Sequence, residues 1–385
     1  MTDLTLEEKA SLTSGSDTWH TTPIGEAVPA LTLSDGPHGL RRQAERGDAL
    51  GLGDSVPATC FPPAVALGSS WDAHLAHRVG AALAREACAL GVDVVLGPGV
   101  NIKRSPLCGR NFEYFSEDPH LTGVMGAAVV TGIQSLGVGA CVKHFAVNNQ
   151  ETDRMRVSAD VDEQSLREIY LPAFERIVRE AKPYTVMCSY NRINGVHASQ
   201  NRWLLTEVLR EEWGFDGLVM SDWGAVNDRV AALEAGLDLE MPPTGTDEEI
   251  VEAVRSGRLP EAVLDLAAGR LLELVRRVEG RASFEGWDLD AHHELAREAA
   301  RASAVLLKND GDVLPLRQGQ RVAVVGELAR TPATRAAAAP TCCPRGWTTR
   351  GRRWDGRPSP RGTGWTGSPT PASRARRWPP RPRPT

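Results

Sequence analysis

The sequence predicts an α/β fold built on a parallel sheet, and two observations support this prediction. Short apolar runs of strand length alternate with amphipathic segments of helix length, which is typical of strand–helix–strand units. In addition, polar residues follow several of the apolar runs, and a β/α barrel places its functional groups at the ends of its strands. The alternation alone leaves an open, doubly wound sheet as an alternative, whereas the polar strand ends favour a barrel.

The expected strands are apolar runs bounded by glycine or polar residues. They are Ala30–Leu33, Val92–Leu96, Gly139–Val142, Tyr184–Cys188, Gly217–Met220 and Gly236–Leu239. The expected helices carry apolar residues at helical spacing and begin or end at capping residues. They are Trp71–Leu90, Asp162–Ala181, Asn201–Trp213, Asp247–Gly257, Pro260–Val278 and Ala291–Leu307.

The charge of the chain is unevenly distributed. The formal net charge is −5, yet residues 331–385 contain twelve Arg, no Lys and one acid, Asp355. This segment therefore carries +11, which leaves −16 for residues 1–330. An acidic body argues against nucleic acid or an anionic membrane as its partner.

Other compositional features point to a cytoplasmic protein. The first residues show no signal-peptide pattern, and no apolar run reaches the length of about 18 residues that a membrane helix needs. The seven Cys are scattered and odd in number, which suits free thiols in a reducing compartment. No Cys or His cluster has metal-ligand spacing, so we expect neither a metal nor another cofactor.

Four of the expected strands are followed by polar residues. Asp35 follows Leu31–Leu33, Lys143 and His144 follow Ala140–Val142, Tyr190 follows Val186–Cys188, and Asp222 follows Val219–Met220. A carboxylate at the end of a buried strand is costly to desolvate. Two hypotheses for Asp222 are therefore open: it is a functional acid, or it is the N-cap of a helix.

The types of these residues suit a sugar better than a phosphate. Sugar hydroxyls need both donors and acceptors, and the C–H face of a sugar packs on an aromatic ring, which Trp223 would supply. The sequence contains no phosphate-binding glycine loop of a familiar kind. The charged candidates are Asp35, Arg110, Lys143, His144, Arg154 and Asp222.

Six motifs, in order along the chain, together resemble glycoside hydrolase family 3. The resemblance runs from about Leu4 to about Gly326. The motifs are Ser34–Arg41, Gly97–Asn101, Gly109–Glu113 with Ser116–Pro119, Lys143–Phe145, Ser189–Asn191 and Ser221–Trp223.

The resemblance implies a (β/α)8 TIM-type barrel followed by an α/β sandwich domain, and retaining hydrolysis of a terminal β-linked sugar such as β-D-glucose. It makes Asp222 the nucleophile, and Trp223 would line the same pocket. Two simpler readings stay open: Arg110 and Glu113 could form a structural pair, and Tyr190 could be a core hydroxyl. The residues that match the sugar-binding positions are Asp35, Arg41, Arg110, Lys143, His144, Arg154 and Tyr190.

The matching motifs do not include an acid/base residue. Phe145–Arg154 is similar to the glucosidase type of the family rather than the N-acetylglucosaminidase type, and in the glucosidase type a Glu of the second domain is the acid/base. Nothing after Gly326 matches, and residues 331–385 contain no Glu. We therefore expect impaired turnover. The alternatives are a non-catalytic sugar-binding remnant and a β-glycoside phosphorylase.

The expected organisation is a barrel over residues 1–280, a linker over 281–290, and the first helix and strand of an incomplete sandwich domain over 291–330. Arg321–Gly326 is the expected strand of that domain. Residues 331–385 lack Val, Leu, Ile, Met and Phe, so they cannot build a core and we expect disorder. A natural basic tail and a slip of the reading frame near Arg330 both explain this segment, and we favour the slip. The expected partner is a small carbohydrate, and a homo-oligomer stays open.

Overall fold

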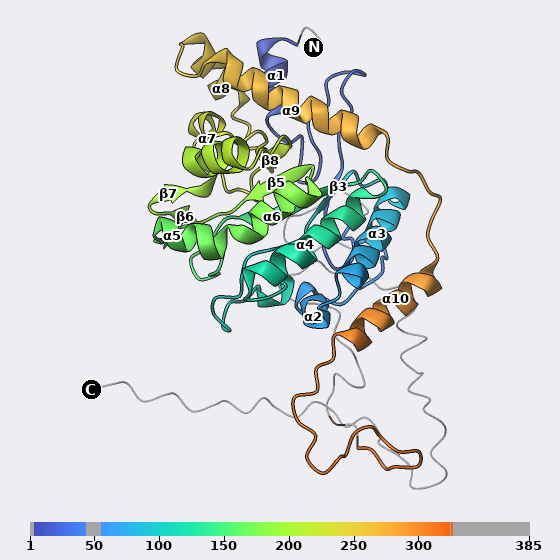
Figure 1. Ribbon diagram of the computed structural model, residues 1–385. Coiled ribbons are helices and arrows are strands. Elements are labelled where there is room, and N and C mark those ends of the chain that lie inside the picture. The colour runs from blue at the N-terminus through green and yellow to red at the C-terminus, as the bar shows by residue number, and fades with distance from the viewer. Residues whose placement is uncertain (1–3, 44–54, 324, 326–385) are drawn as a thin grey trace, which may run out of the picture. The chain divides into compact units, whose positions relative to one another are not determined.

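A mainly parallel sheet lies at the centre of the computed structural model, which describes residues 4–43, 55–323 and 325 (Figure 1). Its strand order is β1-β2-β3-β5-β8, and every neighbouring pair is parallel. The predicted α/β class with a parallel sheet is therefore confirmed. The strands are β1 (Leu33–Asp35), β2 (Val94–Leu96), β3 (Gly139–Phe145), β5 (Thr185–Cys188) and β8 (Leu218–Met220).

Both faces of this sheet are buried. In β8, Leu218 and Met220 join one apolar cluster together with Leu271, whereas Val219 joins a second cluster. Successive side chains of a strand point to opposite faces, so the two clusters lie on the two sides of the sheet. Burial on both sides explains why these strands appear in the sequence as continuous apolar runs.

Helices α3 and α4 pack closely, and α4 packs in turn against α6 (Figure 1). Glycines allow the close approach of α3 and α4. A Cβ at Gly132 would lie 2.2 Å from the carbonyl oxygen of His77, and one at Gly80 would lie 2.5 Å from that of Val129. The helices of this layer are α2 (Ala64–Ser70), α3 (Ala73–Ala89), α4 (Pro119–Gln134) and α6 (Pro172–Ala181).

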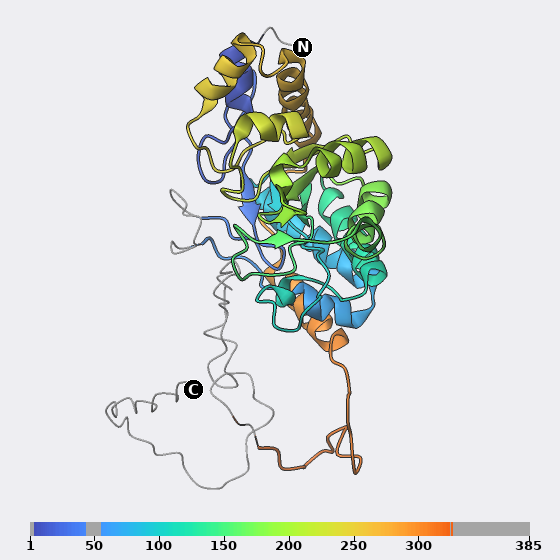
Figure 2. The same ribbon diagram turned by 90° about the vertical axis from the view of Figure 1, so that its left-hand side faces the viewer.

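A second group of helices packs around α1 and α9 (Figures 1 and 2). Helix α1 contacts α8 and α9, and α9 also contacts β8. Thr5 caps α1, because its hydroxyl accepts from the backbone N–H of Glu8 at 3.1 Å while the Glu8 carboxylate accepts from the backbone N–H of Thr5. These helices are α1 (Leu6–Leu12), α7 (Arg229–Ala235), α8 (Asp247–Arg255) and α9 (Glu261–Glu279).

The segments that follow β3 and β5 form a small three-stranded sheet. Its order is β4-β6-β7, with β4 and β6 parallel and β6 and β7 antiparallel. It consists of β4 (Ser158–Ala159), β6 (Arg192–Ile193) and β7 (Val196–His197). The short helical segments are η1 (Asn111–Glu113), α5 (Glu163–Ser165), η2 (Leu166–Tyr170), η3 (Ala198–Gln200) and η4 (Trp203–Glu212).

Isolated bridges extend the central sheet beyond both of its edges. On the β8 side, Met220 pairs in parallel with Leu239, and Glu240 pairs in parallel with Ser14. On the β1 side, Thr32 pairs with His20 in antiparallel fashion. Gly15 and Thr21 pair in the same antiparallel way.

Two predicted strands are wrong. In Gly236–Leu239 only Leu239 pairs with a neighbour, because Gly236 adopts φ 105° and ends α7. Residues 321–323 and 325 of the expected strand Arg321–Gly326 are exposed and not in a strand, since no strand in the described part of the chain pairs with them. Residues 331–385, with the expected disorder, lie outside the described residues.

The predicted helix Ala291–Leu307 is present as α10 (Leu289–Ala302), which contacts α2 and α3. Among the described residues, no helix is long and apolar enough to cross a membrane. The cysteines of this part, Cys60, Cys88, Cys108, Cys141 and Cys188, are all free thiols.

Candidate active site

Polar side chains from three parallel strands meet at one edge of the central sheet. Asp35 ends β1, Lys143 and His144 lie near the end of β3, and Asp222 follows β8 by two residues. The Nζ atom of Lys143 lies 2.9 Å from Oδ1 of Asp35, and Nε2 of His144 lies 3.7 Å from Oδ2 of Asp222. Because the strands are parallel, their carboxyl ends lie at the same edge. Residues that are far apart in the sequence are thereby brought together.

The two oxygens of the buried Asp222 carboxylate have different surroundings. Oδ1 accepts a hydrogen bond from the backbone N–H of Trp223 at 2.8 Å. Oδ2 is buried and has no hydrogen-bond partner among the described residues. Burial raises the pKa of this carboxyl, and the positive charges of Arg110 and Lys143 oppose the increase. A buried, unsatisfied carboxylate oxygen is costly, which is typical of a functional group.

The helix that follows β8 is not capped by Asp222. The N-cap of α7 is Asp228, whose side chain accepts from the backbone N–H of Ala231 at 3.0 Å. The hypothesis that Asp222 is the N-cap of this helix is therefore excluded.

Glu113 links two cations close to Asp222. Its Oε2 accepts from Nε of Arg110 at 2.8 Å, and its Oε1 lies 3.4 Å from Nζ of Lys143. Burial acts to raise the pKa of Glu113, but Arg110 and Lys143 outweigh it and hold the pKa at about 2. For Lys143, burial lowers the pKa, whereas Asp35 and Glu113 raise it and prevail. Glu113, Arg110 and Lys143 are therefore charged at neutral pH.

His144 is held by its backbone and by its ring. The side-chain amide of Asn101 accepts from the backbone N–H of His144 and donates to its carbonyl oxygen, both at 2.9 Å. The Nδ1 atom of His144 lies 3.2 Å from the hydroxyl oxygen of Tyr114. Burial, together with Arg110 and Lys143, holds the pKa of His144 well below its ordinary value. The ring is therefore neutral at physiological pH and presents Nε2 toward Asp222.

Tyr190 contacts both Trp223 and Arg154. The Tyr190 hydroxyl donates to the carbonyl oxygen of Trp223 at 3.1 Å, and it also lowers the pKa of the Asp222 carboxyl, so it lies near both groups. The Cζ atom of Arg154 lies 4.7 Å from the centroid of the Tyr190 ring. Arg154 also donates to Glu151 at 2.8 Å.

Trp223 and Trp19 form an aromatic pair at the site. Their ring centroids are 5.4 Å apart, and Nε1 of Trp223 donates to the carbonyl oxygen of Thr18 at 2.8 Å. The Cζ atom of Arg41 lies 5.7 Å from the Trp19 ring. Arg41 also donates its backbone N–H to the Asp35 carbonyl oxygen at 3.0 Å. Both tryptophans are partly exposed, so an apolar face remains accessible.

Sequence reasoning missed several residues of this arrangement. The sequence indicates Glu113 only as a structural partner of Arg110, whereas in the structure it also contacts Lys143. Asn101, Tyr114 and Trp19 were not singled out. Glu113 and Asn101 lie inside the motifs Gly109–Glu113 and Gly97–Asn101, so their place in these motifs is the signal that the sequence offers.

The site is rich in charge but does not have the arrangement of a metal centre. Among residues 4–43, 55–323 and 325, no group of three or more His, Cys, Asp and Glu side chains could hold a metal ion. Its carboxylates Asp35, Glu113 and Glu151 are matched instead by Lys or Arg.

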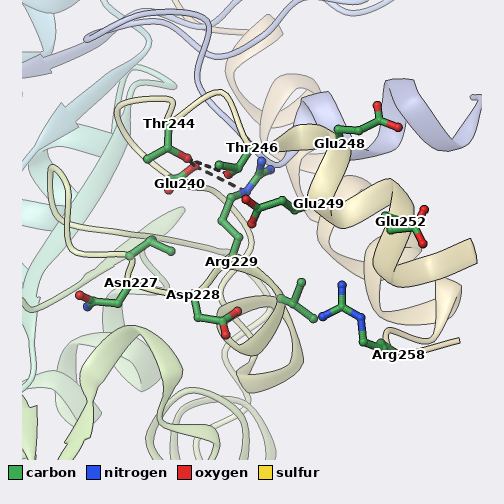
Figure 3. A pocket seen from close by; sticks show the side chains of 12 residues that line it. Asn227, Asp228, Arg229, Glu240, Thr244, Thr246, Glu248, Glu249, Glu252 and Arg258 are labelled. Carbon is green, nitrogen blue, oxygen red and sulfur yellow. Dashed lines mark hydrogen bonds and ion pairs between the residues drawn. The ribbon is translucent and has the colours of Figure 1, made fainter. Parts of the chain in front are cut away.

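A hollow of about 590 Å³ beside α7 and α8 contains none of these residues (Figure 3). Figure 3 shows the Arg229 side chain beside Glu240, and its Nε lies 3.5 Å from that carboxylate. Its Nη1 lies 2.5 Å from Asp247, which does not line the hollow. Burial raises the pKa of Glu240, and Arg229 opposes the increase. These charges pair with each other, whereas Oδ2 of Asp222 has no hydrogen-bond partner among the described residues, so the Asp222 cluster is the better candidate for chemistry.

Comparison with protein families gives one match that covers most of the site. A model described as "Glycosyl hydrolase family 3 N terminal domain" matches residues 40–274. This range includes Asp222, Trp223 and every predicted sugar-binding residue except Asp35.

Two characterised relatives are similar over most of this chain. An exo-α-(1→6)-L-arabinopyranosidase of Bifidobacterium longum is 57% identical over 343 residues, which cover 86% of this chain and 45% of the relative. A thermostable β-glucosidase B of Acetivibrio thermocellus is 55% identical over 333 residues, which cover 86% of this chain and 44% of the relative. The chain thus spans about half the length of the curated relatives it matches.

Solved structures give the same result. A family 3 β-glucosidase of Bifidobacterium adolescentis matches with a TM-score of 0.83 and 55% identity, covering 89% of this chain and 49% of that one. The β-glucosidase 3B of Thermotoga neapolitana in complex with α-D-glucose matches with a TM-score of 0.82 and 40% identity, covering 90% of this chain and 53% of that one.

Proposed function

The chain belongs to glycosyl hydrolase family 3, and from this premise we propose that it is a retaining exo-glycosidase with Asp222 as its nucleophile. Its substrate is a terminal, non-reducing β-D-glucosyl or similar β-glycosyl residue. The observation that carries the proposal is Oδ2 of Asp222, a buried carboxylate oxygen without a hydrogen-bond partner in the described part of the chain. An attacking oxygen has to be free in this way.

The charged groups around Asp222 suit the binding of a sugar ring. Asp35 accepts hydrogen bonds from hydroxyls, and Lys143 and Arg110 donate them, so charge-assisted contacts of both kinds are available. Trp223 provides a face for the C–H groups of the ring. The remaining positions assigned to hydroxyl binding are Arg41, His144, Arg154 and Tyr190.

The chemical step follows from the position of Asp222. Oδ2 forms a bond to the anomeric carbon while the bond from this carbon to the leaving oxygen breaks, and the leaving oxygen takes a proton from a general acid. Water then attacks the same carbon, gives its proton to the resulting base, and releases Asp222. Arg110 and Lys143 favour the ionised carboxylate that the first step requires.

A general acid in this chain is not provided by the carboxylates next to Asp222. Glu113 has a pKa of about 2 and is ionised, Asp35 is bound to Lys143, and Glu151 is bound to Arg154. We therefore propose that the chain glycosylates Asp222 readily only when the leaving group needs no proton. Natural glycosides would turn over slowly.

The names of the relatives support a pyranose as the substrate class. One relative is named for L-arabinopyranose and another is a β-glucosidase, and a solved relative contains glucose. We propose a β-D-glucoside as the first substrate to test, with an L-arabinopyranoside as the second.

We also propose that the central sheet closes into a TIM-type barrel. The bridges from Met220 to Leu239 and from Glu240 to Ser14 lead away from β8, and the bridge from Thr32 to His20 leads away from β1. The pair Gly15–Thr21 joins these two edges. Closure of the sheet in this way removes both of its free edges.

The proposed function is tested with a 2-deoxy-2-fluoro-β-D-glucoside that has a dinitrophenolate leaving group. The fluorine slows hydrolysis of the covalent intermediate, and dinitrophenolate departs with the bonding electrons and needs no proton. The full chain should gain the mass of one fluorosugar, and peptide mapping should place it on Asp222. Asp222→Asn is the control and should take no label.

Other outcomes point to other functions. If the chain binds glucose by calorimetry but takes no label, a sugar-binding protein without chemistry replaces the proposal. If the label forms on another residue, the assignment of Asp222 is wrong. If inorganic phosphate releases the label as a fluorosugar phosphate faster than water does, the chain is a phosphorylase.

A further inference from the structure

Glu113 divides its two carboxylate oxygens between two cations. Oε2 accepts from Nε of Arg110 at 2.8 Å and lies 2.7 Å from its Nη2, while Oε1 lies 3.4 Å from Nζ of Lys143. The three side chains are 5%, 9% and 5% exposed for Glu113, Arg110 and Lys143, so water does not compete for these contacts. Charged groups that are buried in this way are strongly held by their partners.

Arg110 and Lys143 lie near more than one carboxylate. Asp222 is buried next to them, and both of them lower the pKa of its carboxyl, so they lie within electrostatic reach. Even so, Oδ2 of Asp222 accepts no hydrogen bond from Arg110 or Lys143. Lys143 binds Asp35 and Glu113 instead, and Arg110 binds Glu113. The free oxygen of Asp222 thus coexists with two nearby cations that are bound elsewhere.

We propose that Glu113 is a positioning residue that keeps Arg110 and Lys143 from pairing with Asp222. It holds both cations where they can donate to sugar hydroxyls and leaves Oδ2 of Asp222 free to attack the anomeric carbon. This inference rests on the proposed function, and it assigns a role to a carboxylate that does not touch the substrate.

Glu113→Gln removes the charge and keeps the size of the side chain. The amide oxygen can accept from one cation, but the amide N–H2 group then faces the other cation, which is released. The released cation pairs with Asp222, occupies the attacking oxygen and leaves its place beside the sugar. At saturating reagent, the rate constant for labelling should fall by roughly 10- to 100-fold, as expected when a charge-assisted contact is rearranged.

The experiment measures labelling by the dinitrophenyl fluoroglucoside in the full chain, with both the rate constant and the final labelled fraction taken from intact mass. A purely structural role for Glu113 would reduce the labelled fraction and leave the rate constant of the folded molecules unchanged. Glu163→Gln is the matched control, because Glu163 pairs with Arg167 on the surface at 2.8 Å and should not affect either quantity.

Glu113→Asp tests the effect of side-chain length while the negative charge is kept. It keeps the negative charge but is one methylene shorter, so it holds one cation more firmly than the other. Its rate constant should lie between those of the wild type and Glu113→Gln. Wild-type rate constants in both variants, or unfolding of both variants, would overturn the role of Glu113. A wild-type chain that takes no label would instead contradict the proposed function.

Discussion

Replacing Asp238 by Asn should destabilise the sheet edge that carries Asp222. Asp238 is fully buried beneath β8, where its Oδ2 accepts from Nη2 of Arg210 at 2.5 Å and from the backbone N–H of Val219 at 2.8 Å. Its Oδ1 accepts from Nη1 of Arg270 at 2.8 Å. The amide of Asn has a single acceptor oxygen, and its N–H2 group would point at donors. At least one arginine would lose its partner.

The magnitude follows from the burial of this group. The Asp238 side chain is 0% exposed, and Arg210 is 9% exposed, so solvent screening is small. Removing one member of a buried ion pair costs about 3–5 kcal/mol, because the remaining charge stays buried without compensation. For a chain of this size, whose entropy of unfolding is about 2.1 cal/mol/K per residue, the loss corresponds to a decrease in melting temperature of roughly 4–8 °C.

Urea denaturation followed by circular dichroism measures the free energy of unfolding directly. Asp216→Asn is the matched control, because Asp216 forms an exposed pair with Arg277 at 3.0 Å. The control should change the free energy of unfolding by no more than about 1 kcal/mol. Equal effects of the two substitutions would refute the reasoning that Asp238 anchors β8 through buried charge.

Three further predictions concern the site itself. Asp222→Asn should raise the melting temperature at neutral pH. Because burial raises the folded-state pKa of Asp222, its ionisation costs stability as pH rises, so the gain should vanish in acid, where the wild-type carboxyl is protonated in both states. Glu113 behaves in the opposite way: its pKa is lowered from 4.5 to about 2, so it contributes about 3 kcal/mol that is present above pH 4.5 and lost toward pH 2. Melting curves of Glu113→Gln and the wild type should therefore converge in acid, and a constant difference would contradict this. Finally, a double-mutant cycle on Trp19 and Trp223 should give a coupling energy of about 0.5–1.5 kcal/mol, whereas additive effects would show that the rings do not interact.

The sheet could be predicted because its strands are buried on both faces. Leu218, Val219 and Met220 are apolar without alternation, and Gly217 before them is required by a close approach. A Cβ at Gly217 would lie 2.4 Å from the carbonyl oxygen of Tyr184, which directly precedes the neighbouring strand β5. Burial on both faces produces continuous apolar runs, and tight packing requires glycine, so both can be recognised in the sequence.

The wrong strand prediction and the site residues that the sequence did not indicate have physical causes of another kind. Gly236–Leu239 has the apolar composition of a strand, but Asp238 within it is an anchor for two arginines, and only Leu239 pairs. The role of Asn101 depends on hydrogen bonds to His144, which is distant in the chain. Contacts between distant residues have no local periodicity, so a single sequence does not reveal them.

The residue types alone do not rank the acids near the sheet edge, and it is the family resemblance that singles out Asp222. The structure adds a difference in how these acids are paired. Asp35 is bound to Lys143, Glu113 to Arg110 and Glu151 to Arg154, each at 2.9 Å or less. Asp222 alone among these four carboxylates keeps a buried oxygen without a described partner that also lies next to a histidine. Glu151 has an unpartnered oxygen as well, but its side chain is 22% exposed and already bound to Arg154. A nucleophile needs an oxygen that is desolvated and free, and these two properties of Oδ2 support the proposal that Asp222 is the nucleophile.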